Sequence, residues 1–153
     1  MKTIMMNMIR IFRDNEVVVL DKIKKYGWEG LTFPGGKVED GESFFQAAIR
    51  EAKEETNLDI TDISYDGVIL WYDYDARERL VGMLYTARKF SGKLVENNRE
   101  GRLYFQDYKE FISEKNKSDS MDDILSIYNK EYDEINLYYK DGKLINRKKY
   151  KYE

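Results

Sequence analysis

The chain has 153 residues, and its 26 Lys and Arg residues nearly balance 29 Asp and Glu residues, leaving a formal net charge of −3. This length suits one globular domain, so we expect a single domain over residues 1–153. The chain has no Cys and no His, which excludes a disulfide scaffold, a Cys nucleophile, a Ser-His-Asp triad and a thiolate or imidazole zinc site. Any bound metal is therefore expected to be a hard ion with oxygen ligands, Mg²⁺ or Mn²⁺.

The composition also limits location and partners. Asn7 and Arg10 interrupt the apolar N-terminal run, which is too short for a signal peptide, and no later run is long enough to span a bilayer. A nearly neutral net charge does not indicate the basic surface that a stable nucleic-acid partner would need. We therefore expect a cytoplasmic protein with a small-molecule ligand and no membrane partner. The oligomeric state cannot be read from the sequence.

The N-terminal third is predicted to form strands and a shaped loop. Residues 3–12 and 16–23 are rich in Ile, Val and Met, and Asp14-Asn15 between them indicates a hairpin turn. Residues 26–41 contain five of the ten glycines, Gly27 among them, and the only proline. This concentration predicts a loop whose backbone takes conformations that other residues avoid.

A helix is predicted next. Ser43 and Gln46 match a capping box, the apolar residues that follow recur at helical spacing, and Asn57 suits the left-handed end of the helix. Strands are expected at 58–74 and 80–90 around a charged turn at 75–79, and a short strand at 103–105. Helices are expected at 108–114 and 122–132, and a final hairpin at 134–139 and 143–152 turns at Asp141-Gly142. This order indicates an α+β fold, an α/β/α sandwich.

Three glutamates on the first helix point to chemistry. Glu51, Glu54 and Glu55 stand at i, i+3 and i+4, so their carboxylates project from one helix face within roughly a 100° arc. Like charges this close repel one another and need solvent screening or a multivalent cation. Since the arc also overlaps the apolar stripe, where unpaired charge is costly, a metal site is favoured.

The same stretch resembles the Nudix box, G-x5-E-x7-R-E-U-x-E-E-x-G-U. Gly36, Glu42, Arg50, Glu51, Glu54 and Glu55 occupy its identity positions. Asn57 replaces the last glycine, a change that preserves a left-handed turn, and Ala52 is a small residue at an aliphatic position. The resemblance implies a Nudix hydrolase with a Nudix-type α/β/α sandwich, a mixed central sheet and a C-terminal β-hairpin. It also implies Mg²⁺- or Mn²⁺-dependent cleavage of a diphosphate linked to a nucleoside.

The resemblance also implies roles for individual residues. Glu51 would activate water, with Arg50 orienting it and Glu54 assisting catalysis. The metal ligands would be the Gly35 carbonyl and the carboxylates of Glu42, Glu51, Glu54 and Glu55. A further ligand is expected from a later loop, where Glu100 is favoured over Glu96. Lys37 is a candidate phosphate contact, although an exposed loop lysine explains it equally well.

The whole chain also resembles the MutT-like 8-oxo-dGTP diphosphatases, which convert a nucleoside triphosphate to the monophosphate and pyrophosphate. On this basis Asp122 and Asp123 are expected to read the purine edge, although acidic residues also suit a helix N-terminus. Thr32 stands where the subgroup has a base-contacting asparagine, and Phe33 is a candidate for base stacking. The lysines near the C-terminus either contact RNA or, more simply, protect an edge strand.

Two alternatives stay open. In the first, the chain is a Nudix hydrolase with another substrate: ADP-ribose, a dinucleoside polyphosphate, a nucleotide sugar or a capped RNA end. In the second, the chain is a non-catalytic nucleotide-binding regulator. The intact set of three helical glutamates argues against the second alternative.

Overall fold

The computed structural model describes residues 1–23 and 28–153, so Tyr26 and Gly27 of the expected loop lie outside the described residues. The order of the strands in the sheet is β10-β9-β5-β6-β1-β2-β8-β7, with β3 paired to β2 and β4 paired to β1. Neighbours β1 and β6 run parallel, as do β5 and β9, and the other pairs are antiparallel. The mixed sheet and the C-terminal hairpin confirm the predicted fold class. The elements are β1 (Lys2–Arg13), β2 (Glu16–Lys22), β3 (Gly30–Thr32), β4 (Gly35–Lys37), α1 (Phe44–Thr56), β5 (Asp59–Asp73), β6 (Glu78–Ser91), β7 (Asn97–Asn98), β8 (Gly101–Asp107), α2 (Tyr108–Ser113), α3 (Met121–Tyr128), β9 (Glu134–Lys140) and β10 (Lys143–Tyr150).

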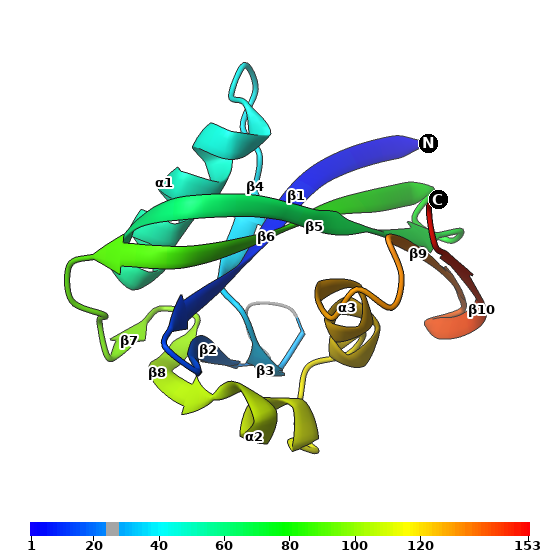
Figure 1. The fold of residues 1–153 in the computed structure, drawn as a ribbon. Helices are drawn as coiled ribbons and strands as arrows, with labels where there is room; N and C mark the ends of the chain where they lie inside the picture. The colour runs from blue at the N-terminus through cyan, green and yellow to red at the C-terminus, as the bar shows by residue number, and fades with distance from the viewer. Residues whose placement is uncertain (24–27) are drawn as a thin grey trace.

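Helices cover both faces of the sheet. In Figure 1, α1 crosses behind the long strands β5 and β6 and rises above them, whereas α3 lies below them. Each side has its own apolar core: Ala48 and Ala52 of α1 pack in one, and Ile124 and Ile127 of α3 pack in the other. Alternation along each strand supplies both cores, because neighbouring side chains point to opposite faces. None of the helices in the described ranges is long and apolar enough to cross a membrane.

Helix α1 begins and ends as its sequence predicts. The Ser43 hydroxyl accepts a hydrogen bond from the Gln46 backbone N–H, and the Gln46 side chain accepts one from the Ser43 N–H. Asn57 ends the helix in the left-handed conformation with φ 70°, so it replaces the glycine of the motif without loss of the turn.

The stretch 26–41 contains two strands, which corrects the prediction of a continuous loop. Strand β4 lies antiparallel to β1, with Gly35 opposite Met8 and Gly36 opposite Asn7. A Cβ atom on Gly35 would lie 2.2 Å from the Asn7 carbonyl oxygen. Gly35 is therefore needed for the close approach of two backbones, whereas composition alone indicates a loop.

The C-terminal part differs from prediction mainly in length. Helix α3 ends at Tyr128, four residues earlier than expected, and the chain reverses at Lys130 with φ 67°. The final hairpin forms as predicted, since Asp141 and Gly142 adopt φ 54° and 72° at its turn. Strand β9 pairs in parallel with β5 and extends the sheet beyond α3.

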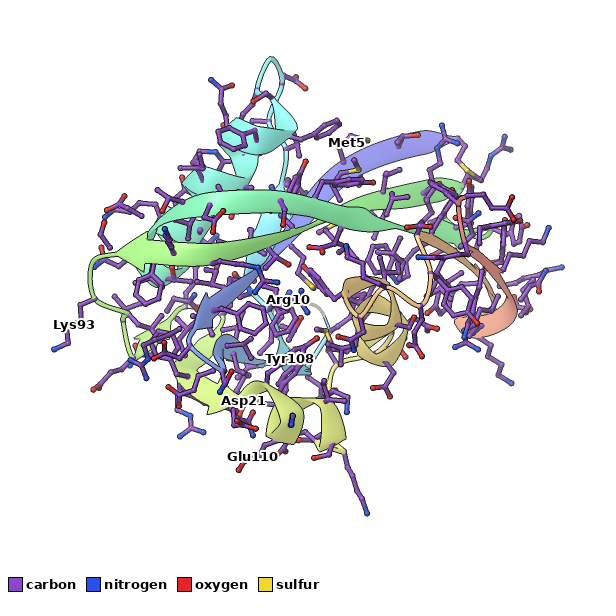
Figure 2. All side chains as sticks on the ribbon, in the orientation of Figure 1. Met5, Arg10, Asp21, Lys93, Tyr108 and Glu110 are labelled. Carbon is purple, nitrogen blue, oxygen red and sulfur yellow. The ribbon has the colours of Figure 1, made fainter. Side chains whose placement is uncertain are left out.

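A buried arginine connects the sheet to α2. Arg10 is 6% exposed; its Nη1 donates to the Tyr108 hydroxyl at 2.9 Å and its Nε donates to the Thr86 hydroxyl at 3.2 Å. Its guanidinium carbon also lies 4.8 Å from the centre of the Tyr128 ring. Figure 2 labels Arg10 and Tyr108 between the sheet and α2. Hydrogen bonds and aromatic faces therefore replace the water that this cation loses on burial.

Candidate active site

Arg50 of α1 binds several of the predicted site residues. Its Nε and Nη2 donate to the two oxygens of Glu42 at 2.7 and 3.0 Å. Its Nη1 donates to Glu51 at 3.0 Å and to Glu54 at 3.1 Å, and Nη2 also donates to the Lys37 carbonyl at 3.0 Å. Its hydrogen bonds to Glu42 and Glu51 raise the pKa of the guanidinium, which stays charged. Arg50 thus joins the loop after β4 to the glutamates of α1 by charge-assisted hydrogen bonds, and the orienting role expected for it stays a prediction.

Glu51 packs directly on the backbone of β4. A Cβ atom on Gly36 would lie 2.4 Å from the carboxyl carbon of Glu51, so a side chain at position 36 would displace this carboxylate. Burial raises the pKa of Glu51, and the hydrogen bond from Arg50 opposes that rise. A half-buried, oriented carboxylate is well suited to accept a proton from water.

Glu55 of α1 meets Glu100, which lies in the turn between β7 and β8. Burial, a hydrogen bond with Glu100 and the charges of Glu100 and Glu51 raise the pKa of Glu55 to about 9. Asn98 donates to Glu55 Oε2 at 2.8 Å, and Lys22 lies 3.5 Å from Glu100. The structure therefore places Glu100, the residue favoured over Glu96, beside the glutamates of α1.

The donor set fits a hard divalent cation in its chemical type. Glu51, Glu54, Glu55 and Glu100 line one cleft, together with Gly35 and Lys37. Crowded carboxylates are stabilised when such an ion lies between them. In the described ranges no three acidic side chains are already arranged to hold one ion, and Arg50 engages two of these four.

Glu42 lies apart from the cleft carboxylates. Both of its oxygens accept hydrogen bonds from Arg50, and these bonds lower the pKa of Glu42. Glu42 does not line the cleft. Its contacts are those of a residue that holds Arg50, and the metal-ligand role expected for Glu42 stays a prediction.

A second pocket opens beside the carboxylate cleft. The two share Met6, Lys22, Gly35, Gly36 and Glu100. The pocket wall is largely apolar and includes Trp28 and Trp71, whose ring centroids lie 5.4 Å apart. Trp28 is 42% exposed and stands at the surface. A flat aromatic ligand that carries phosphates could therefore extend from this pocket into the cleft.

Thr32 and Phe33 both line this pocket, but their side chains also belong to the core. Phe33 is 2% exposed and stacks on Phe111 with ring centroids 4.9 Å apart. The Thr32 hydroxyl lies 3.5 Å from the Phe33 carbonyl and 3.7 Å from the sulfur of Met121. Their substrate contacts stay predictions, and Trp28 and Trp71 provide the more exposed aromatic wall.

Asp122 and Asp123 lie outside this pocket. Asp123 pairs with Arg147 through two hydrogen bonds of 2.9 and 3.1 Å. The Asp122 side chain is 85% exposed and lies 3.3 Å from Lys117. Both line a separate polar hollow, so their expected contact with a purine edge stays a prediction that the geometry does not favour.

Two charged residues of the pocket, Asp119 and Lys22, are not predicted from the sequence. Asp119 lines both the aromatic pocket and the neighbouring polar hollow, and Lys22 stands where pocket and cleft meet. Asp119 lies in a polar loop before α3, and Lys22 ends a strand, so neither has a local pattern that indicates a ligand contact.

Comparisons with known proteins agree with this geometry. Residues 1–125 match the model of the NUDIX domain. The chain is similar to an uncharacterized Nudix hydrolase, YvcI of Bacillus subtilis, with 34% identity over 98 residues that cover 61% of this chain. The match spans 60% of that relative's own length.

Two solved structures extend the likeness. A mutator MutT protein from Bacillus halodurans superposes with a TM-score of 0.78 and 20% identity, covering 95% of this chain and 97% of that one. A MutT NUDIX hydrolase from Burkholderia pseudomallei has a TM-score of 0.59 and 26% identity, covering 70% and 84%. The family model covers more than four fifths of the chain, and the glutamates that match the end of the Nudix box lie on α1. The chain therefore belongs to the Nudix family.

Proposed function

We propose that this protein hydrolyses a nucleoside triphosphate to the nucleoside monophosphate and pyrophosphate, with an oxidised purine such as 8-oxo-dGTP as the favoured substrate. The observation that carries the proposal is the continuity of the aromatic pocket with the carboxylate cleft. A base lying against Trp28 and Trp71 would direct its phosphates past Gly35 and Gly36 toward the glutamates. The choice of a purine substrate follows the resemblance of the sequence to the MutT-like 8-oxo-dGTP diphosphatases.

The cleft suits attack of water on a phosphorus atom. In this proposal Glu51 accepts a proton from water, whose oxygen forms the new bond to phosphorus while the bond to the leaving phosphate oxygen breaks. Arg50 keeps Glu51 oriented through its 3.0 Å hydrogen bond. Glu42 and the Lys37 carbonyl keep Arg50 in place in turn.

Glu51, Glu54, Glu55 and Glu100, with the Gly35 carbonyl, would hold the divalent ion. When bound, Mg²⁺ or Mn²⁺ neutralises phosphate charge and makes phosphorus more susceptible to attack. Lys22 and Lys37, which line the same cleft, would contribute positive charge toward the phosphates. A substrate with several negative charges could otherwise not approach so many carboxylates.

In the base pocket, the proposal assigns the stacking surface to Trp28 and Trp71 and the acidic contact to Asp119. A carboxylate accepts hydrogen bonds from the N–H groups of a purine edge. Thr32 and Phe33 complete the pocket wall near the glycines of β4.

A substrate panel with chromatography of the products tests this proposal. The panel contains 8-oxo-dGTP, dGTP, dATP, dCTP, ADP-ribose, a dinucleoside polyphosphate, a nucleotide sugar and a triphosphorylated RNA. We expect the highest kcat/KM for a purine triphosphate, with pyrophosphate as a product. Preferred cleavage of ADP-ribose or of the RNA would keep the chemistry and replace the substrate, and no turnover of any compound would leave a binding function.

A further inference from the structure

We infer that Tyr139 of the C-terminal hairpin is a specificity-determining residue, because it holds Asp119 in position at the wall of the base pocket. The inference rests on the proposed function, since it takes the aromatic pocket as the site of a nucleotide base. Tyr139 lies in β9, beyond residues 1–125 that match the family model.

Four polar groups form a continuous chain of hydrogen bonds at this place. Trp71 Nε1 donates to the Ser120 hydroxyl at 3.0 Å. The hydroxyls of Ser120 and Tyr139 lie 3.3 Å apart, and the Tyr139 hydroxyl lies 3.4 Å from Asp119 Oδ2. The first and last members, Trp71 and Asp119, both line the base pocket.

Chemistry fixes the direction of this chain. An indole N–H only donates and an ionised carboxylate only accepts. One arrangement therefore satisfies every group: Trp71 donates to Ser120, Ser120 donates to Tyr139, and Tyr139 donates to Asp119. Tyr139 occupies Oδ2, and within residues 1–23 and 28–153 no hydrogen bond reaches Oδ1, so this oxygen can accept an N–H donor from a ligand.

The backbone at Ser120 supports this role. Ser120 has φ 69°, a left-handed conformation that is uncommon for a residue other than Gly, Asn or Asp. It stands at the N-cap of α3, yet its hydroxyl makes no capping hydrogen bond. The hydroxyl instead bonds Trp71 and Tyr139, so a stabilising helix cap is replaced by contacts that organise the pocket wall.

The ligand that fits is a base with N–H donors along its hydrogen-bonding edge. Guanine and 8-oxoguanine carry a ring N–H and an amino group side by side, whereas cytosine presents a ring acceptor beside its amino group. An oriented Asp119 oxygen would favour the guanine pattern. Tyr139 acts through Asp119 and touches no reacting atom, so its loss should change substrate choice and leave the chemical step intact.

The test compares Tyr139→Phe with Tyr138→Phe. Tyr138 is the adjacent residue and stacks on Tyr72 with ring centroids 4.9 Å apart, so its variant is a matched control for loss of one hydroxyl from β9. Binding of 8-oxo-dGMP, dGMP and dCMP is measured by tryptophan fluorescence, since Trp28 and Trp71 line the pocket. We expect Tyr139→Phe to weaken guanine nucleotides by about threefold to tenfold, with little change for dCMP. KM for 8-oxo-dGTP should rise by a similar factor while kcat stays constant.

A double-mutant cycle shows whether Tyr139 works through Asp119. In an Asp119→Ala background, Tyr139→Phe should have no further effect on guanine binding. Ser120→Ala removes the hydrogen bond that orients the Tyr139 hydroxyl, so it should weaken guanine binding in the same direction but by a smaller factor. It is the second variant if Tyr139→Phe melts at a markedly lower temperature.

The inference is overturned if Tyr139→Phe matches Tyr138→Phe, or if its effect persists fully without Asp119. If the wild-type protein neither binds nor hydrolyses any nucleotide, the proposed function fails first and the inference fails with it.

Discussion

The carboxylate cleft and the base pocket share a border but are built in different ways. Most of the cleft comes from one stretch of chain, residues 35–55, which is joined by Met6, Lys22 and the segment 98–100. The pocket takes one to three residues from each of the strands β1 to β6, and others from α3 and the loop before it. The chemistry is therefore encoded locally, whereas substrate choice depends on the assembly of the whole sheet.

This difference predicts two kinds of mutational effect. Changes in the cleft should reduce kcat, because they act on interactions made in the transition state. Changes in the pocket should mainly raise KM and shift substrate preference, because base contacts are made about equally in ground and transition states.

The largest effect is expected from removing the metal or one of its carboxylates. Activity should be lost in excess EDTA and return with Mg²⁺ or Mn²⁺. Glu54→Gln and Glu55→Gln should each lower kcat by orders of magnitude, because each removes one ligand charge. Steady-state kinetics and circular dichroism separate catalysis from folding.

Glu39→Gln is the matched control for these variants. Its side chain is 67% exposed and lies 3.6 Å from Arg50, outside the cleft. Near-normal kcat in both Glu54→Gln and Glu55→Gln, or full turnover in EDTA, would place the metal site elsewhere.

A second test uses the contact between β4 and α1. Gly36→Ala introduces a Cβ atom 2.4 Å from the Glu51 carboxyl carbon, so Glu51 must leave its position. We expect kcat to fall by about a hundredfold, on the scale of effects seen for misplaced catalytic groups. A variant with unchanged kcat and a normal melting temperature would show that Glu51 does not need this position.

The third test compares three alanine variants, at Asp119 before α3 and at Asp122 and Asp123 within it, by their effects on kcat/KM and on the melting temperature. Asp119→Ala should lower kcat/KM for 8-oxo-dGTP by about tenfold through KM, as expected for loss of one hydrogen bond to a carboxylate. Asp122→Ala should have little effect. Asp123→Ala leaves Arg147 without its partner, so we expect a lower melting temperature and unchanged purine preference.

Measuring kcat/KM for 8-oxo-dGTP, dGTP and dCTP beside the melting temperature distinguishes these outcomes. Loss of purine preference in Asp122→Ala or Asp123→Ala, with Asp119→Ala normal, would return the base-reading role to the residues that the sequence predicts.

The smallest effect is expected at the floor of the pocket. A Cβ atom on Gly82 would lie 3.0 Å from the Trp71 ring, so Gly82→Ala should displace the ring by a few tenths of an ångström. We expect KM for the purine triphosphate to rise severalfold with kcat unchanged. A fall in kcat instead, without a change in KM, would contradict the separation between pocket and cleft.

Local patterns explain what the sequence could predict. The capping box at Ser43, the turn at Asp141-Gly142 and the spacing of Glu51, Glu54 and Glu55 each depend on residues close together in the chain. Such short-range patterns need no knowledge of tertiary structure. They account for the confirmed helix, the confirmed hairpin and the composition of the cleft.

The remaining features depend on contacts between distant segments. Strand β4 exists because β1 lies beside it, and nothing within residues 35–37 indicates a strand. Lys22 and Asp119 reach the pocket through pairing and loop placement, while Asp122 and Asp123, which look equally suitable in sequence, point elsewhere. Without knowledge of the topology, the sequence cannot show which acidic residue near the start of α3 lines the pocket.

The parallel pairing of β9 with β5 has a consequence for protein synthesis. During translation every glutamate of the cleft emerges before β9 does, and until then β5 exposes one edge that carries Ile69 and Trp71. An apolar strand with an unpaired edge is prone to associate with other chains, so the nascent protein is most open to association during this interval. After β9 has paired with β5, β10 pairs with β9 and places Lys143, Lys148 and Lys149 along the new edge of the sheet. Charged side chains at an edge disfavour pairing with another chain, so the finished sheet is less prone to association than the unfinished one.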